Sequence, residues 1–273
     1  MSHAATTPSG AAGAAEPGRA DPEAWLRRLR AAPGPTAGAP LLVCFPHAGG
    51  AASSFRPLAA ALGGAVETVA VQYPGRQDRY AEPCVEDLDE MAALVAESLR
   101  LRDGGQGRPT AFFGHSMGAT LAFAVARLLE GPGSSGPVGL FASARKAPSV
   151  AEGRQVHLLG DAEVVAELKS LGGTAAGALD DEELVGLVLP AVRSDYRALE
   201  TYRPRPGERL GCPVTAVLGD ADPRVAPAQA AAWAGHTASE FRIRVLPGGH
   251  FYLNDQVEAV AGLVRERLAA WAG

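Results

Sequence analysis

Short apolar runs alternate with helical patterns along most of the chain. We expect strands over residues 41–45, 66–73, 110–113, 138–143, 214–218 and 241–246, the first of them a buried apolar run. Apolar residues recur at helical spacing in residues 85–101, 119–129, 227–233 and 256–270. Strands that alternate with helices pair in parallel, so the pattern predicts an α/β fold with a mostly parallel central sheet flanked by helices.

One segment breaks this alternation, because residues 145–210 carry helical signals only. Asp180 and Glu183 have the spacing of a capping box, which predicts a helix start at this point. Pro190 falls inside the helical pattern that follows and predicts a kink or a split there. We therefore expect a helical lid inserted between two strands of the sheet.

The N-terminal residues differ in composition from the rest of the chain. Residues 1–20 are mostly Ala, Gly, Pro, Ser and Thr, which bury too little apolar surface to offset the entropy of ordering. We predict a disordered tail there, and one folded domain over residues 21–273. Asp21-Pro22-Glu23 has the pattern of a helix start, with Pro at the first helical position. A short apolar stripe follows at Trp25, Leu26 and Leu29.

Composition and charge narrow the classes of partner. The net charge is −5 and no long basic run is present, so we expect no nucleic-acid partner. The three cysteines, Cys44, Cys84 and Cys212, lie far apart without a CxxC pair, which argues against a metal site or a disulfide. We find no signal peptide and no apolar stretch that could span a bilayer, and so predict a cytoplasmic protein with no membrane contact.

A candidate nucleophile, Ser116, lies between an expected strand and an expected helix. It is the centre of Gly114-His115-Ser116-Met117-Gly118, a Gly-x-Ser-x-Gly motif. The bare motif is weak, but its position between strand and helix is the one that a nucleophile elbow requires. The alternative interpretation is a capping serine in a glycine-rich turn.

A serine nucleophile needs a general base, and three histidines follow Ser116. His157 falls in the expected lid and His236 follows a helical segment. His250 follows an expected strand and the flexible pair Gly248-Gly249. Because α/β sheets place functional groups beyond the carboxyl ends of strands, we predict His250 as the base.

The acid that orients the base should lie beyond the preceding strand. Asp220 and Asp222 both follow the strand that ends near Gly219. We favour Asp222, since it leaves room for the turn after Gly219, although either carboxylate could reach His250. Asp220 is then a turn residue.

Stabilisation of an oxyanion needs two backbone N–H donors. We expect one from Met117, directly after the candidate nucleophile, and one from Ala48 in the loop after the first long strand. Gly49-Gly50 in this loop lets the backbone turn close to a ligand. His47 is interpreted either as a histidine that packs the loop or as part of a pocket wall.

Six segments together carry a family resemblance. They are "LLVCFPHAGGAASSF", "VQYPGRQDRY", "FFGHSMGA", "RSDYRALETY", "LGDADPRV" and "PGGHFYL". In this order they resemble the type II thioesterases, stand-alone enzymes of the α/β-hydrolase fold that accompany polyketide synthases and nonribosomal peptide synthetases. The resemblance runs from about Trp25 to the C-terminus. The medium-chain acyl-carrier-protein hydrolase of fatty acid synthesis is similar.

The resemblance implies a substrate class and a partner. Such enzymes hydrolyse aberrant or stalled acyl groups from the 4′-phosphopantetheine arm of acyl or peptidyl carrier proteins, and so edit the assembly line. Ser116 would attack the thioester carbonyl, His250 would accept its proton, and Asp222 would hold the imidazolium. No cofactor is implied, and we expect a monomer that meets carrier domains.

Further residues are assigned more loosely on the same resemblance. Arg76 of "YPGR" belongs either to a structural turn or to the pocket mouth. Arg193, Asp195 and Tyr196 match an R-x-D-Y element that we interpret as anchoring the lid to the core. Together with His47 and Gly49, Arg76 and Tyr196 are candidates for the substrate pocket or its support.

Other functions remain open at this point. A general carboxylesterase or an acyltransferase would use the same three residues. A chain-terminating thioesterase domain of a synthase is a further alternative, although "FPHAGG" favours the stand-alone type. A catalytically silent module that binds a carrier protein is the alternative outside the enzymes.

Overall fold

A computed structural model describes residues 20–29, 34–103, 107–131, 136–151, 153, 155–172 and 177–271. The predicted disordered tail therefore lies outside the described residues, except for Ala20.

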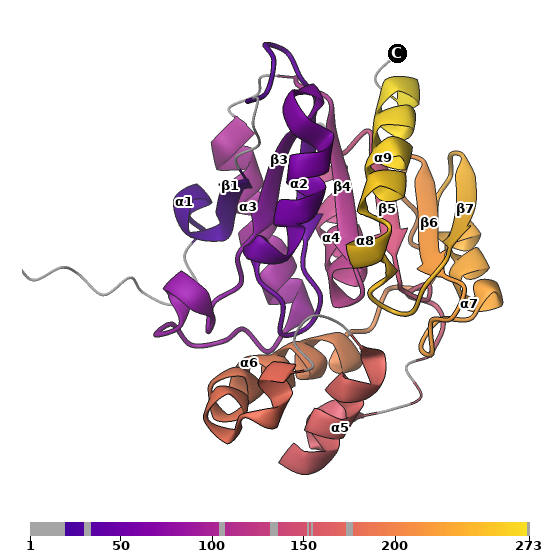
Figure 1. The fold of residues 1–273 in the computed structure, drawn as a ribbon. Helices are drawn as coiled ribbons and strands as arrows, with labels where there is room; N and C mark the ends of the chain where they lie inside the picture. The colour runs from indigo at the N-terminus through magenta and orange to yellow at the C-terminus, as the bar shows by residue number, and fades with distance from the viewer. Residues whose placement is uncertain are drawn as a thin grey trace, which may run out of the picture.

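A twisted sheet forms the centre of the molecule (Figure 1). Over the described residues it has seven strands in the order β1-β3-β2-β4-β5-β6-β7. Strand β1 pairs with β3 in antiparallel orientation, and every other neighbouring pair is parallel. The strands are β1 (Leu26–Leu29), β2 (Leu41–Phe45), β3 (Glu67–Val71), β4 (Thr110–His115), β5 (Gly139–Ser143), β6 (Val214–Gly219) and β7 (Phe241–Leu246). The predicted mostly parallel α/β fold is confirmed.

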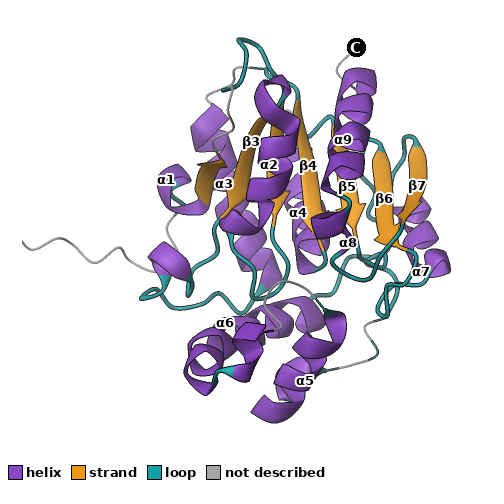
Figure 2. Cartoon of the chain, viewed as in Figure 1, coloured by secondary structure: helices purple, strands orange, loops and turns teal. Residues whose placement is uncertain are grey.

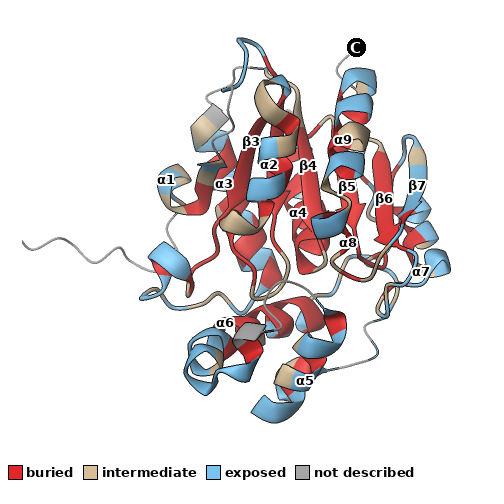
Figure 3. Ribbon diagram, in the orientation of Figure 1, coloured by how far each residue is buried: buried red, intermediate tan, exposed pale blue. Residues whose placement is uncertain are grey.

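Helices cover both faces of this sheet (Figure 2). One face packs against α3, α4 and α7, and the other against α2, α8 and α9. The α-helices are α1 (Pro22–Trp25), α2 (Arg56–Leu62), α3 (Leu88–Asp103), α4 (Met117–Leu129), α5 (Asp161–Leu171), α6 (Glu182–Thr201), α7 (Pro227–Ala231), α8 (Tyr252–Asp255) and α9 (Val257–Trp271). Because both faces are covered, every residue of β2 and β5 is buried, which explains their unbroken apolar runs (Figure 3).

The segment between β5 and β6 lies beside the carboxyl ends of the strands (Figure 1). Its described residues form α5, α6 and two short 3₁₀ turns, η4 (Val156–Leu158) and η5 (Gly177–Asp180), and no strand, as the helical signals predicted. A small apolar core of its own holds the segment together: Val156, Val164, Leu189, Val192 and Tyr196. We call residues 145–210 the lid.

Three details differ from the sequence prediction. Helix α1 begins at Pro22 with Asp21 as its cap, but it ends at Trp25, and the apolar stripe continues as strand β1. The cap of α6 is Asp181, whose carboxylate accepts hydrogen bonds from two backbone N–H groups, while Asp180 bonds Lys169 instead.

Pro190 does not split α6, which runs unbroken from Glu182 to Thr201. Proline removes one intrahelical hydrogen bond, but Leu189 before it and Val192 after it are both buried in the apolar core of the lid. Packing on both sides of the proline holds the helix together, since tertiary contacts supply most helix stability in proteins.

Two glycines let the strand β4 turn directly into helix α4. A Cβ atom on Gly114 would lie 2.3 Å from the carbonyl oxygen of Gly118, inside the first helical turn. A Cβ atom on Gly118 would lie 2.0 Å from the carbonyl oxygen of Phe45, at the end of β2. Both neighbours are backbone atoms that cannot swing away, so this corner of the fold has no room for a side chain.

We expect Gly118→Ala to lower the free energy of unfolding by about 1–3 kcal/mol, because the added methyl forces α4 away from β2. The matched control is Gly262→Ala in α9, where nothing lies within 4 Å of an added Cβ. There the better helix propensity of alanine should raise stability by up to about 1 kcal/mol. Urea unfolding followed by circular dichroism measures both, and an equal effect of the two variants would contradict the packing argument.

Candidate active site

Ser116 sits at the turn between β4 and α4 in a strained backbone conformation. Its φ is 54° and its ψ is −121°, in the region that residues with a side chain rarely adopt. Its backbone N–H donates to the carbonyl oxygen of Ser143 at 2.8 Å, which ties the turn to the neighbouring strand β5. The turn leaves Ser116 at the N-terminal end of α4, where the helix dipole favours negative charge.

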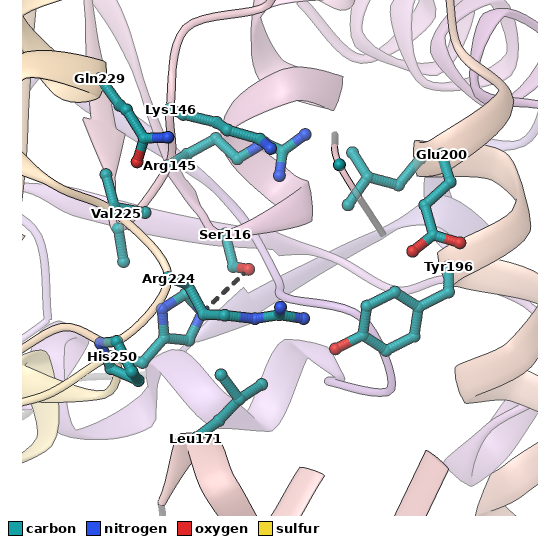
Figure 4. Close-up of a pocket in the computed structure, with 14 residues that line it drawn as sticks. Ser116, Arg145, Lys146, Leu171, Tyr196, Glu200, Arg224, Val225, Gln229 and His250 are labelled. Carbon is teal, nitrogen blue, oxygen red and sulfur yellow. Dashed lines mark hydrogen bonds between the residues drawn. The ribbon is translucent and has the colours of Figure 1, made fainter. Parts of the chain in front are cut away.

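The side chain of Ser116 is hydrogen-bonded to His250, as Figure 4 shows. Its Oγ lies 3.0 Å from Nε2 of His250. The other ring nitrogen, Nδ1, lies 3.1 and 3.0 Å from the two carboxylate oxygens of Asp222. The side chains of His250 and Asp222 are 4% and 0% exposed. Burial and these contacts fix the ring so that Nε2 faces Ser116.

The two candidate acids have separate partners. Asp222 bonds the ring of His250, whereas Oδ1 of Asp220 accepts a hydrogen bond of 2.9 Å from the backbone N–H of Gly248. The favoured residue, Asp222, is thus the one beside the histidine. Asp220 holds the loop that carries His250, and Gly219 packs so tightly there that a Cβ would lie 2.2 Å from the carbonyl oxygen of Gly248.

The loop after β2 presents Ala48 next to the start of α4. Among the described residues, no hydrogen-bond acceptor faces the backbone N–H of Ala48 or of Met117. Neighbouring backbone groups of the loop are hydrogen-bonded, since the N–H of Gly50 donates to the carbonyl oxygen of His47 at 2.9 Å. The two free N–H groups come from the residues expected to bind an oxyanion.

A cavity of about 290 Å³ opens beside Ser116 and His250 (Figure 4). Tyr196 from α6 lines it and is buried, and burial raises the pKa of its hydroxyl. The remaining wall includes residues that sequence reasoning did not single out for the pocket: Arg145, Lys146, Leu171, Glu200, Arg224 and Gln229. They come from four separate stretches of chain, so no local motif could have grouped them.

Two charged side chains in this wall form hydrogen bonds or ion pairs with residues of the lid. Glu200 accepts hydrogen bonds from the backbone N–H groups of Val156 and His157, at 2.8 and 3.1 Å, and so caps η4. Arg224 forms an ion pair with the buried Glu167 of α5. The lid therefore forms one side of the cavity, and its anchoring determines the shape of the space above Ser116.

A second cavity, of about 420 Å³, is lined in part by the loop after β2, including His47 and Gly49. The ring of His47 meets Phe251 edge-on, with ring centroids 4.8 Å apart. His47 thus combines both interpretations, because it packs against a neighbouring ring and also forms part of a cavity wall. The candidate Arg76 lines neither cavity and is buried against Asp195 of α6.

His115, which precedes Ser116, was not among the predicted site residues. Its Nδ1 lies 2.9 Å from Oγ of Ser143, which in turn lies 2.7 Å from the hydroxyl of Tyr252. Burial lowers the pKa of His115 well below its ordinary value. This neutral histidine places no positive charge beside His250 at pH 7. Only its position inside the Gly-x-Ser-x-Gly motif could have drawn attention to it.

The described residues contain no group of three or more His, Cys, Asp or Glu side chains arranged to hold a metal ion. Cys44, Cys84 and Cys212 are all free thiols. In that same part of the chain, no helix has the length and apolar character needed to cross a membrane.

Comparison with known proteins gives a consistent result. A family model of the thioesterase domain matches residues 40–268. The chain is 50% identical over 236 residues to a probable cadicidin biosynthesis thioesterase of Streptomyces griseus, covering 86% of this chain and 63% of that protein. It is 47% identical over 249 residues to the thioesterase PikA5 of Streptomyces venezuelae, covering 91% of this chain and 87% of that protein. This chain thus spans somewhat less than two thirds of the first relative and most of the second.

A solved structure is similar over nearly the whole fold. The type II thioesterase BorB from the borrelidin biosynthetic cluster is 50% identical in sequence and superimposes with a TM-score of 0.81. The match covers 90% of this chain and 98% of BorB.

The environment of His47 generates a prediction about pH. Desolvation, with smaller effects of His250 and Arg76, lowers the pKa of His47 from 6.5 to about 4. The unfolded chain therefore binds a proton at this residue more readily than the folded chain. The free energy of unfolding should fall as the pH drops from about 6.5 to about 4, by at most about 3 kcal/mol from this residue.

We expect His47→Gln to flatten that fall, because glutamine does not titrate. Urea unfolding of both proteins at pH 7, 6, 5 and 4.5 measures the difference in slope, with pH 7 as the reference for any change unrelated to titration. Parallel curves for the two proteins would show that His47 keeps an ordinary pKa in the folded state.

Proposed function

Because the chain belongs to the thioesterase family and to its type II thioesterases, we propose that it hydrolyses acyl thioesters from the 4′-phosphopantetheine arm of carrier proteins. The observation that carries this proposal is the chain of hydrogen bonds from Ser116 through His250 to Asp222. A strained serine, a buried histidine and a buried carboxylate in this order are the groups that nucleophilic acyl transfer needs.

In the first half of the proposed reaction, Ser116 forms an ester with the acyl group. Nε2 of His250 takes the proton from Oγ of Ser116 as that oxygen attacks the thioester carbonyl. The oxyanion formed then lies against the backbone N–H groups of Ala48 and Met117. When the carbon–sulfur bond breaks, His250 returns the proton to the pantetheine sulfur, and the thiol leaves.

In the second half, water completes the hydrolysis. His250 takes a proton from the water as it attacks the ester, and the second oxyanion uses the same two N–H groups. Collapse of this intermediate releases the free acid and returns the proton to Ser116. Throughout, Asp222 accepts a hydrogen bond from Nδ1 of His250, which fixes the tautomer and stabilises the imidazolium.

The cavity beside Ser116 has room for an acyl group such as acetyl, propionyl or butyryl. Its volume of about 290 Å³ is at the lower limit of typical ligand pockets. A thiolate is a good leaving group, so turnover depends mainly on placing the carbonyl and admitting water. A larger cavity of about 820 Å³ shares Arg145, Leu199 and Glu200 with the cavity beside Ser116, so the space near Ser116 does not exclude longer chains.

The proposed role is editing on a polyketide synthase or nonribosomal peptide synthetase. Removal of stalled, misprimed or prematurely decarboxylated acyl units would free blocked carrier arms. The thioesterase from the borrelidin cluster and the one named for cadicidin biosynthesis support this setting. The partner is then a carrier domain, with no cofactor of the enzyme's own.

The two neighbouring carboxylates provide a matched pair of variants. We expect Asp222→Asn to lower kcat by about 10³–10⁴-fold, because the amide cannot orient the ring or stabilise its charge. Asp220→Asn should stay within about threefold of wild type, since its side-chain oxygen can still accept from Gly248. Thioester hydrolysis of acetyl-carrier protein measures both, with Ser116→Ala as the inactive reference. Equal losses in the two Asp variants would contradict the assignment.

The substrate class is tested by comparing carriers with small esters. We expect hydrolysis of acetyl, propionyl and butyryl groups from carrier protein to exceed that of the same groups on free pantetheine by at least about tenfold in kcat/KM, because binding of the carrier contributes to the transition state. The same panel on free pantetheine and on p-nitrophenyl esters separates the alternatives. Faster turnover of the small esters would favour a general carboxylesterase. Failure of a fluorophosphonate to label Ser116 would favour a module that only binds carriers.

A further inference from the structure

We infer that Asp195 and Arg76 are positioning residues for the oxyanion-binding loop, residues 46–52, and that they couple the lid helix α6 to it. The inference rests on the proposed function, because it assigns a role in the same reaction. Neither residue touches the reacting atoms. Both act through the backbone of Gly49 and Gly50, directly after Ala48.

The hydrogen bonds of the loop show how its backbone is held. Oδ2 of Asp195 accepts from the backbone N–H of Gly49 at 2.7 Å, and Nη1 of Arg76 donates to the carbonyl oxygen of Gly50 at 3.2 Å. Further along, the N–H of Ala52 donates to the side-chain oxygen of Gln72 at 2.8 Å.

The start of the loop is held in the same way. The hydroxyl of Tyr73 donates to the carbonyl oxygen of Pro46 at 3.0 Å. Backbone groups on both sides of Ala48 thus bind side chains, while the N–H of Ala48 binds none among the described residues. Buried backbone groups without partners are costly, so these contacts select one loop conformation and leave one donor for the substrate.

The ion pair at the centre of this arrangement is fully enclosed. The side chains of Arg76 and Asp195 are 8% and 0% exposed, and two hydrogen bonds of 2.5 and 2.9 Å join them. The desolvation of a buried pair offsets much of its attraction, so an apolar pair of similar volume is often equally stable. Stability alone therefore does not require these charges. Positioning of the loop does require a charged or polar side chain at residue 195, because no apolar side chain can accept the hydrogen bond from Gly49.

Helix α6 also contacts the loop by shape. Gly49 has a φ of +74°, and a Cβ on it would lie 2.6 Å from Cγ2 of Val192. Asp195 and Val192 are one turn apart on α6, so one face of the lid helix supports Gly49 through both a hydrogen bond and a close packing contact. A displacement of α6 would move the backbone N–H of Ala48. Hydrolysis would therefore require α6 to stay packed against the loop.

We expect Asp195→Asn to lower kcat for acetyl-pantetheine by about 10–100-fold, with KM changed less than threefold. Both carboxylate oxygens of Asp195 accept hydrogen bonds, from Gly49 and from two nitrogens of Arg76, and an amide cannot accept all three. The loop then shifts, and the loss is part of the effect of losing an oxyanion donor. Labelling of Ser116 by a fluorophosphonate should slow in parallel. Arg197→Gln is the matched control, because Arg197 lies on the same helix and joins it to the core through an exposed ion pair with Glu86 of 2.7 Å. This control should keep the kcat of the wild type.

A double variant separates positioning from stability. In Arg76→Met with Asp195→Leu, both charges are replaced by apolar side chains of similar volume. We expect an unfolding free energy at least as high as that of Asp195→Asn, while kcat stays at least tenfold below wild type. If the double variant is as stable as the wild type and also has its kcat, the inference is overturned. An Asp195→Asn enzyme with the kcat of the wild type would overturn it as well.

If the proposed function is wrong, the experiments give a different result from a failure of the positioning inference. In that case the wild type hydrolyses no thioester at all, and the rate of fluorophosphonate labelling at Ser116 still tests the positioning. Slower labelling in Asp195→Asn than in Arg197→Gln supports the inference, and equal rates overturn it.

Discussion

The turn at Ser116 is the constraint on which the rest of the site depends. A positive φ at a residue with a side chain costs free energy, and the surrounding backbone must hold it. Strand β5 does so through the carbonyl oxygen of Ser143, and the absence of side chains at Gly114 and Gly118 lets α4 start against the end of β2. That contact also brings the oxyanion-binding loop next to the start of α4. The same packing therefore holds the turn at Ser116 and places the loop beside it.

The parallel sheet then collects the remaining groups at one edge. Ser116, Asp222 and His250 follow β4, β6 and β7, and their loops meet because β4 to β7 are consecutive parallel strands whose carboxyl ends share one edge of the sheet. The loop of His250 is further held by Asp220, so a carboxylate that does not touch the ring still determines where the ring lies. Two aspartates two residues apart thus orient the same histidine, one through its ring and one through its backbone.

Sequence reasoning located most of this fold because its signals are local. Buried parallel strands are unbroken apolar runs, and β2, which is buried throughout, was predicted at its observed bounds. Short elements such as β1, which is four residues long, carry too little pattern to separate from a helix end. The Arg76–Asp195 pair was out of reach for another reason. Its members are 119 residues apart, and each motif taken alone explained only a turn or an anchor.

Burial of charge around the site has a common physical basis. A buried carboxylate is tolerated only where hydrogen-bond donors surround it, and such donors also fix geometry. Asp222 accepts hydrogen bonds from the ring of His250 and from the backbone N–H of Arg224. Asp195 accepts them from the guanidinium of Arg76 and from the backbone N–H of Gly49. In both cases the carboxylate binds one cation or imidazole and one backbone N–H. In the proposed reaction, the first carboxylate orients the histidine that transfers the proton, and the second holds the loop that binds the oxyanion. Hydrogen bonds from the protein itself hold both carboxylates, and such preorganised geometry is what electrostatic stabilisation of a transition state requires.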